Sequence, residues 1–505
     1  MPLTEDGKIP YTAIYAGASH MSRIYSELAA NSLTVTSSTD GTLYVIDDKA
    51  NLRANMDARI NATWVHSDGV IEAHILGRTG TEITVRRPGA TAPANTVAPG
   101  AASTNLRLSG FSPGFWIQAY VGRPFDDQFV LAFGGVSIAQ TLQFMKDWGA
   151  TGEKVGFLFY QAGTNSILSG ASAGAIIAIS KEALNEAEKL AHICIIQGLT
   201  NFDYTNQQLS VMDEVNSWLQ AECVRRGKHF KWANWNNAYI VRNGVKLYLE
   251  QSDRKVAQWA RISRSDMHLN PTSAKAIADT VIRPLIEEYL PIRLNWKQSI
   301  HMQKNFFCKM ASPQDPLFAI GTAAPPGGLN QASNAVIVNT RNSLNGKINS
   351  PGAHTEWVVS STAPSPNNES FAVAEFSPEL LRLRSLIGEK ICCAIDVRIP
   401  AGSRFTGAWL VVRADDINGS IGEVHGGNNN AGNQPEANLG SETEDVFFTL
   451  FTNWFRLPEN FSGTRFAFRA VMYFVQSENH NWRPPQKAVF AVSNPRILLK
   501  RDWVK

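Results

Sequence analysis

Apolar runs alternate with amphipathic stretches in two parts of the chain, residues 10–31 and 128–292. Short continuous apolar runs are typical of strands that are buried on both faces, and four such runs are YTAIYAG, FVLAFGG, KVGFLFYQ and HICIIQG. Between and after them, apolar residues recur at helical spacing in residues 138–148, 172–190, 212–227 and 270–290. This alternation predicts an α/β unit, a parallel sheet with helices on both faces.

The first part of the pattern, residues 10–29, predicts a strand, a turn and a helix. An apolar run from Tyr11 to Tyr15 precedes the turn Gly17–Ser19. Met21, Ile24, Tyr25 and Leu28 then follow at helical spacing, which favours a helix directly after the turn.

A different pattern fills residues 32–125. Segments such as SLTVTSS, GTLYVID, NATWVHS, IEAHILG and TEITVRR are short, rich in β-branched residues and separated by Gly, Asp and Asn. That composition predicts antiparallel strands. We therefore expect residues 32–125 to be a β-rich module, a candidate for carbohydrate binding, inserted into an α/β domain made of residues 1–31 and 126–300.

After about residue 300 the helical pattern nearly disappears. Residues 301–366 contain much Pro, Gly, Asn, Ser and Ala, and we interpret them as a connector. Apolar strands dominate residues 367–505, which predicts a β-sandwich, jelly-roll-like domain. Within it, residues 418–442 are dense in Gly and Asn and predict a long loop.

Composition narrows the classes of function. The 505 residues carry a net charge of only +3, which gives no basis for binding nucleic acid or an anionic membrane surface. No apolar run is long enough to span a bilayer, and the first residues do not resemble a signal peptide. The five cysteines match no zinc site and are too few for a disulfide scaffold. We therefore expect their thiols to be free and the protein to be made in a reducing compartment.

Candidate catalytic residues follow the predicted strands. Ser19 follows the first strand, Gly135 the second and Asn165 the third, while His268 lies before the final helix. The carboxyl ends of parallel strands meet at one edge of a sheet, so these residues are expected to lie close together. A histidine can activate a serine hydroxyl for acyl transfer, and backbone or amide N–H groups can stabilise the oxyanion.

Four blocks in this order resemble the SGNH (GDSL-type) hydrolase superfamily. AIYAGASHMSRI resembles its first block, in the form found in carbohydrate acetylesterases, and FGGVSIAQT, YQAGTN and DMHLNPTSAKAIAD resemble the others. The resemblance implies a three-layer α/β fold with Ser19 as nucleophile, His268 as general base and Asp266 as its orienting acid. It further implies an oxyanion hole of Ser19, Gly135 and Asn165, and no metal or cofactor.

The sequence departs from the family pattern at several positions. The usual Asp, three residues before the histidine, is replaced by Ser265, and Asp266 lies only two residues before His268. Either Asp266 orients the imidazole, or a Ser–His dyad works with a carbonyl. In the second block the oxyanion donor is Gly134, Gly135 or the amide of Ile138, depending on the alignment.

Taken singly, these residues have ordinary structural explanations. Ser19 suits a turn or helix N-cap, Asn165 a turn, and His268 the start of a helix. Ala18 and Ser166 also depart from the usual residues of their blocks. It is the order of the four blocks that favours an active site over these separate roles.

The resemblance implies a serine esterase that removes O-acetyl groups from a polysaccharide. Because it has β modules and free thiols, the protein resembles a bacteriophage tail spike or fibre. Such a protein would be made in the host cytoplasm and would act in the virion, as a homotrimer, on O-antigen or capsule. The alternatives are a secreted bacterial acetylxylan or exopolysaccharide esterase, and a catalytically dead glycan-binding adhesin. Five tryptophans are candidate sugar-stacking platforms or packing residues: Trp232, Trp235, Trp409, Trp454 and Trp482.

Overall fold

The computed structural model describes most of the α/β unit and the strands of the remaining chain. The described residues are 9–22, 24–27, 34–37, 42–46, 58–59, 72–79, 82–86, 95–97, 104–132, 135–149, 152, 154–262, 268–291, 308–309, 336–342, 355–361, 370–378, 384–405, 407–416, 419–428, 438–452, 454–456, 465–474 and 488–500.

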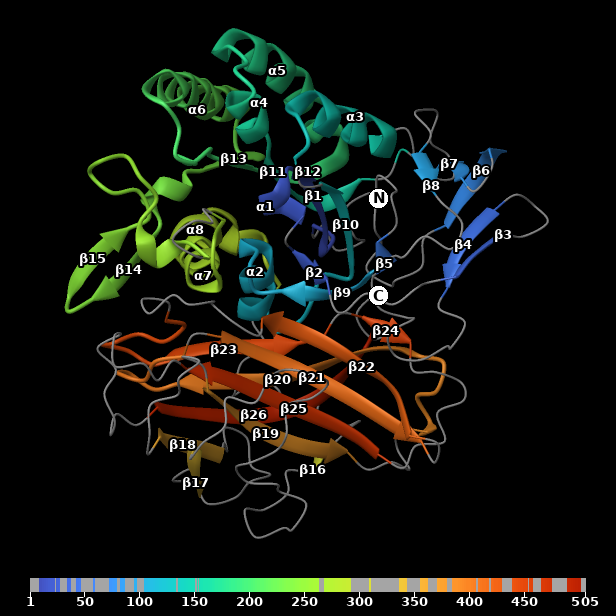
Figure 1. Ribbon diagram of the computed structural model, residues 1–505, viewed down its shortest axis with the longest axis vertical. Helices are drawn as coiled ribbons and strands as arrows, with labels where there is room; N and C mark the ends of the chain where they lie inside the picture. The colour runs from blue at the N-terminus through green and yellow to red at the C-terminus, as the bar shows by residue number, and fades with distance from the viewer. Residues whose placement is uncertain are drawn as a thin grey trace.

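A five-stranded parallel sheet forms the centre of the α/β unit (Figure 1). Its strands are β1 (Thr12–Gly17), β10 (Asp127–Ala132), β11 (Val155–Gln161), β12 (Ala191–Gln197) and β13 (Phe230–Ala233), in the order β10-β1-β11-β12-β13. The predicted α/β class with a parallel sheet is confirmed. Because later strands add on both sides of β1, the strand order reverses at β1, and ligands bind at the carboxyl end of such a strand.

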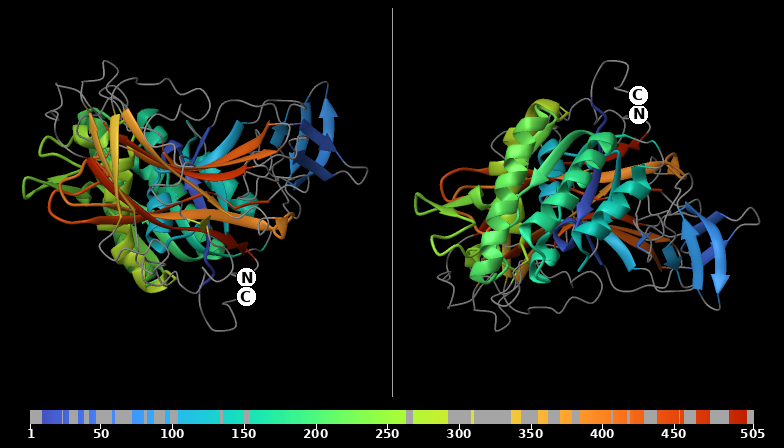
Figure 2. Two further views of the ribbon diagram at one scale, coloured as in Figure 1. Left: turned by 90° about the horizontal axis from the view of Figure 1, so that it is seen from below. Right: turned by 90° about the horizontal axis from the view of Figure 1, so that it is seen from above.

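Helices cover both faces of this sheet. One face packs against α3 (Ile138–Gly149), α4 (Thr164–Leu168), α5 (Ala173–Leu190) and α6 (Asn206–Arg226), of which α3, α5 and α6 lie side by side (Figure 2, right). The other face packs against α2 (Pro113–Val121), α7 (Pro271–Ile277) and α8 (Arg283–Ile286), with a π-helical turn, Ala278–Ile282, joining the last two. Successive residues of β1 alternate between the two cores, as a pleated strand requires.

The helix predicted after the first strand is wrong beyond its first turn. Helix α1 (Ser19–Ser22) is a single turn, and β2 (Tyr25–Glu27) follows as a strand. β2 pairs antiparallel with β9 (Thr104–Ser109), and Ser109 N–H donates to the Ile24 carbonyl at 2.8 Å. Pairing with a distant segment therefore overrides the local helical spacing.

The β-rich pattern of residues 32–125 is confirmed for part of its length. Five strands form an antiparallel sheet, in blue at one edge of the molecule in Figure 1: β3 (Thr34–Ser37), β4 (Thr42–Ile46), β6 (Glu72–Thr79), β7 (Glu82–Arg86) and β8 (Asn95–Val97). The short β5 (Ala58–Arg59) pairs with β9, and the predicted strand NATWVHS lies outside the described residues. Residues 113–121, however, are the helix α2, because Ser112 caps it and Pro113 occupies its first turn.

Two antiparallel sheets form the C-terminal part. One contains β16 (Cys308–Lys309), β19 (Ser370–Pro378), β25 (Arg465–Phe474), β21 (Gly407–Asp416) and β22 (Gly419–Asn428), and it continues into β9 and β2. The other contains β17 (Val336–Asn342), β18 (Thr355–Ser361), β26 (Ala488–Leu499), β20 (Lys390–Ile399), β23 (Val446–Phe451) and β24 (Phe455–Arg456).

These sheets correct two predictions. Strands β17 and β18 lie within residues 301–366, predicted to be a connector, and β22 occupies the start of the predicted loop 418–442. β18 pairs with β26 and β22 pairs with β21, and this pairing stabilises as strands two segments whose composition favours loops. The antiparallel strands are confirmed, whereas the jelly-roll connectivity stays a prediction. Four buried cysteines, Cys194, Cys223, Cys392 and Cys393, form no disulfide.

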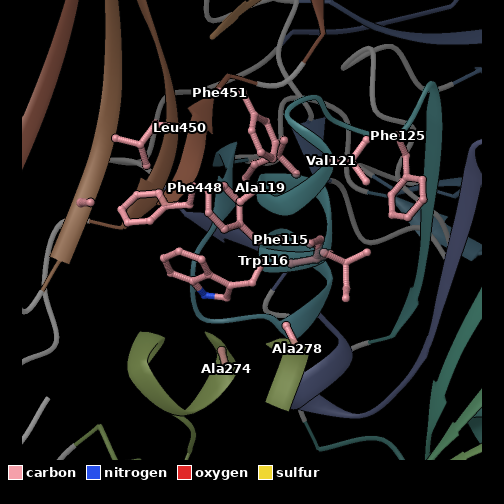
Figure 3. Packing of buried hydrophobic residues seen from close by; sticks show 14 of the residues in the cluster. Phe115, Trp116, Ala119, Val121, Phe125, Ala274, Ala278, Phe448, Leu450 and Phe451 are labelled. Carbon is pink, nitrogen blue, oxygen red and sulfur yellow. The ribbon is translucent and has the colours of Figure 1, made fainter. Parts of the chain in front are cut away.

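The C-terminal sheets share a hydrophobic core with the α/β unit through α2 (Figure 3). Phe115 stacks on Phe451 with ring centroids 5.0 Å apart, and Trp116 meets Phe448 edge to face at 5.4 Å. Trp454 donates its indole N–H to the Phe125 carbonyl at 2.8 Å. The C-terminal sheets and the α/β unit therefore pack against each other through α2 and Phe125.

Candidate active site

Ser19 lies immediately beyond the carboxyl end of the central strand β1. Gly17 ends this strand, and a Cβ there would lie 2.0 Å from the Gln161 carbonyl oxygen, so only glycine permits this close approach. The chain then turns, and Ser19 begins the single helical turn α1 with its side chain half-buried. The turn therefore presents the hydroxyl at the edge of the sheet.

His268 is held by the loop that leads into α7. Asn270 is fully buried and caps α7 by accepting from Ser273 N–H at 2.9 Å. Its Nδ2 donates to the carbonyls of Trp259 at 2.6 Å and Arg261 at 3.0 Å. Three hydrogen bonds thus fix the backbone two residues beyond His268, and the His268 carbonyl accepts from Ile262 N–H at 2.8 Å.

The structure brings these two predicted residues together. His268 Nε2 lies 2.9 Å from Ser19 Oγ, a hydrogen-bond distance. Both side chains are half-buried, so each retains some exposure to solvent. This is the arrangement in which a neutral imidazole can take the hydroxyl proton of a serine.

Register places the other predicted loops beside Ser19. Gly17 lies opposite Ala132 on β10 and opposite Gln161 on β11, so the chain leaves all three strands at the same level. Gly135 follows Ala132 with a φ of 80°, a left-handed conformation that favours glycine. Asn165 follows Gln161 at the start of α4.

Two hydrogen bonds tie the Gly135 loop to α4. Asn165 Nδ2 donates to the Val136 carbonyl at 2.9 Å, and Ile138 N–H donates to Ser166 Oγ at 3.2 Å. The Ile138 amide, one of the three alternative oxyanion donors, is therefore occupied by Ser166. The second hydrogen on Asn165 Nδ2 is a further donor of the same group.

His20 forms a wall of the site that the sequence did not single out. It is buried, and its ring centroid lies 5.2 Å from that of His268. It also packs against Phe202 at 4.8 Å and against the edge of Trp235 at 5.6 Å. Its position directly after Ser19 was the only signal in the sequence.

The remaining predicted residues are the tryptophans and those that lie outside the described part of the chain. Asp266 and Gly134 lie outside the described residues, as does Trp482. Trp235, Trp409 and Trp454 are buried and serve packing, whereas Trp232 is half-buried. Among the described residues, no group of three or more His, Cys, Asp or Glu side chains is placed to hold a metal ion. Within the same part of the chain, no helix is long and apolar enough to cross a membrane.

Comparison with known proteins gives distant likenesses. No protein-family model matches the chain, and no curated protein matches it. A lipolytic protein of the G-D-S-L family from Veillonella parvula is similar at 18% identity, over 36% of this chain and 93% of its own, with a TM-score of 0.26. A GDSL-like lipase from Bacteroides thetaiotaomicron is similar at 13% identity, over 32% of this chain and 77% of its own, with a TM-score of 0.24.

The CBM22-1 xylan-binding domain of Paenibacillus barcinonensis Xyn10C is similar at 12% identity. That likeness covers 32% of this chain and 81% of the domain, with a TM-score of 0.17. Identity and TM-score are low in all three cases, so the function of this chain has to be argued from its own residues.

Proposed function

We propose that the protein is a serine-dependent ester hydrolase that removes O-acetyl groups from a polysaccharide. The 2.9 Å contact between Ser19 Oγ and His268 Nε2 at the carboxyl edge of the parallel sheet carries the proposal. The four SGNH-like blocks support the same chemistry, because three of them follow neighbouring strands that end at one level and the fourth brings His268 to Ser19 from the loop before α7.

The mechanism follows from these atoms. His268 Nε2 accepts the Ser19 proton while Oγ attacks the acetyl carbonyl, and the protonated imidazole then protonates the departing sugar oxygen. Ser19 N–H, Gly135 N–H and the second Asn165 amide hydrogen are the proposed donors to the oxyanion. Water, deprotonated by His268, attacks the acetyl–serine ester, and the bond to Ser19 Oγ breaks as His268 returns the proton to that oxygen, so that acetate is released. In this mechanism Asp266 orients His268.

The glycan substrate is the finer part of the proposal. The Ser19 block resembles carbohydrate acetylesterases, and extensive β-rich parts accompany the α/β unit. We propose a bacterial surface polysaccharide, O-antigen or capsule, as the substrate, and a trimeric phage tail spike or fibre as the setting. A bacterial acetylxylan or exopolysaccharide esterase is the alternative setting for the same chemistry.

The test is acetate release from a panel of purified bacterial surface polysaccharides and acetylated xylan. Wild type is measured beside Ser19→Ala, with Ser210→Ala, an exposed serine on α6, as the matched control. Release that requires Ser19 but not Ser210 supports the esterase and identifies the glycan. Binding of a glycan without release of acetate would instead favour the adhesin.

A further inference from the structure

A polar groove opens on the carboxyl side of the sheet, beside its edge strand β13. We call it the α6–β15 groove, and its volume is about 480 Å³. Its floor and walls come from α6, the end of β13, the turn η1 (Trp235–Asn237), the strand β15 (Val245–Tyr248) and the segment after it. Its lining includes Trp232, Asn234, Asn236, Tyr248, Glu250 and Arg254.

Like Ser19, the groove lies at the carboxyl ends of the strands of the sheet. In the order β1-β11-β12-β13, three strand spacings, about 14 Å, separate the central strand from the edge strand. Trp235 lies between the Ser19 site and the groove. Its ring contacts the ring of His20, and the next residue, Asn236, lines the groove. A short oligosaccharide can span this distance.

The charged groups of the groove are already paired. Arg254 binds both carboxylate oxygens of Asp213, at 2.5 and 3.1 Å, and donates to Glu250 Oε1 at 2.6 Å. This pairing fixes the three side chains before any ligand arrives. With two carboxylates to one guanidinium, the groove does not favour an anionic ligand such as a phosphate.

Two buried acceptors in the groove have no hydrogen-bond partner among the described residues. They are Asn236 Oδ1 and Glu250 Oε2. Burying an acceptor without a donor has a free-energy cost of about 1–3 kcal/mol, so a donor supplied from the groove would relieve it. Burial also raises the pKa of the Glu250 carboxyl.

Aromatic rings complete the lining. Trp232 is half-buried at the end of β13, and Tyr248 is 48% exposed at the end of β15. Amides, carboxylates and a serine hydroxyl surround them, with no aliphatic side chain in the lining. Ring faces beside planar polar groups suit a ligand that has both C–H surfaces and many hydroxyls.

We infer that the α6–β15 groove binds a sugar residue of the glycan whose ester is cleaved at Ser19. The inference rests on the proposed esterase function, because it assigns the groove to the same substrate chain. Hydroxyl donors of the sugar reach the side of the groove that holds Asn236 and Glu250, and its ring lies against Trp232 or Tyr248. Binding at this distance holds the acetylated residue over the nucleophile.

The experiment measures binding in a background that cannot cleave the ester. Labelled Ser19→Ala protein is applied to an array of purified bacterial surface polysaccharides and acetylated xylan. It is compared with the same protein carrying Asn236→Ala and Tyr248→Ala. The control carries Val245→Ala, an exposed residue on the opposite face of β15.

We expect the groove substitutions to weaken binding of at least one glycan by about tenfold or more, and Val245→Ala to leave it unchanged. If the double substitution lowers the melting temperature, glycan binding is measured with Tyr248→Ala alone, because that side chain is exposed and its loss should leave the fold intact. Equal binding by the groove variant and its parent, or no glycan bound by the parent, would overturn the inference.

Hydrolysis of p-nitrophenyl acetate by wild type and Ser19→Ala separates this inference from the proposed function. Serine-dependent hydrolysis with no loss of glycan binding in the groove variant means that only the groove assignment fails. Binding that depends on the groove, in a protein without serine-dependent hydrolysis, means that the esterase proposal fails and the groove belongs to a lectin-like protein.

Discussion

Ser19 Oγ and His268 Nε2 are 2.9 Å apart although 249 positions separate them in the chain. The contact joins the end of the first strand of the α/β unit to the loop before α7. Two residues make this contact possible. Gly17 lets the chain turn sharply at the end of β1, against β11, and Asn270 fixes the loop that carries His268. The pair thus depends on the completed fold and not on local sequence.

Removal of either member of this pair should abolish ester hydrolysis. We expect Ser19→Ala and His268→Ala to lower kcat for p-nitrophenyl acetate by about 10³-fold or more, because neither partner works alone. Initial rates with purified protein check this, with circular dichroism to confirm folding. His229→Ala, at an exposed histidine, is the control and should keep full activity. Normal rates in Ser19→Ala would contradict the assignment.

Asp266 should contribute less than His268. Its position, two residues before the histidine and not three, predicts a smaller loss of kcat in Asp266→Asn than in His268→Ala. The same steady-state assay measures both. Losses of the same size would show that Asp266 is a full member of a triad and that the changed spacing has no effect.

Asn270 should act as a positioning residue. Asn270→Ser keeps an oxygen that can cap α7 but loses both Nδ2 donors, to the carbonyls of Trp259 and Arg261. We expect kcat to fall about tenfold or more, with a change in its pH profile, because the imidazole loses its fixed orientation. Measurements are made well below the melting temperature. A lower melting temperature with an unchanged kcat and pH profile would show a purely structural role.

The buried ion pair between Arg496 and Asp396 should be strongly coupled. Arg496 Nη1 lies 2.9 Å from Asp396 Oδ1, both side chains are buried, and Arg496 also donates to the Gly122 carbonyl at 3.2 Å. We expect Arg496→Met to lower the free energy of unfolding by about 3–5 kcal/mol, because it leaves a carboxylate buried without its partner.

A double-mutant cycle with Asp396→Asn tests this coupling by denaturant unfolding. The double variant should be less destabilised than the sum of the two single variants, by about 1 kcal/mol or more. Strict additivity would show that the two side chains stabilise the fold independently.

Glu222 should make stability depend on pH in the acidic range. Hydrogen bonds from Arg225, and then those from Arg226, lower the pKa of Glu222 from 4.5 to about 2. The unfolded chain therefore binds the proton more tightly. The stabilisation is fully present above about pH 4.5 and is lost as the pH falls toward 2.

Thermal unfolding between pH 2 and 7 checks this dependence. Glu222→Gln should lower the melting temperature at pH 7, and its difference from wild type should shrink as the pH approaches 2. Glu214→Gln, at an exposed position of the same helix, is the control. A difference that stays constant with pH would contradict the role of the carboxylate charge.

Much of the α/β unit could be predicted because its signals are local. The strands β1, β10, β11 and β12 are apolar on both faces and give unbroken hydrophobic runs. Helix α6 begins at Asn206, six residues before the predicted start at residue 212, but its end is marked by Gly227, with a φ of 85°. Such features need no knowledge of the rest of the chain.

The elements that were missed depend on distant partners. Tyr25 has helical spacing from Met21 but belongs to a strand, because β9 pairs with it. The aromatic and β-branched residues of α2 resemble a strand, and the Ser112–Pro113 cap was the only local sign of a helix. The order of Ser19 and His268 could be recognised, but their distance and the role of Asn270 required the fold.

The position of α2 has a consequence for how the protein can be divided. Phe115 and Trp116 project from this helix into Phe448 and Phe451 of β23, while the same helix covers the parallel sheet (Figure 3). A fragment of the α/β unit that ended before the C-terminal sheets would expose these rings to water. The C-terminal sheets are therefore a folding partner of the α/β unit, because the rings of α2 lose their cover without them.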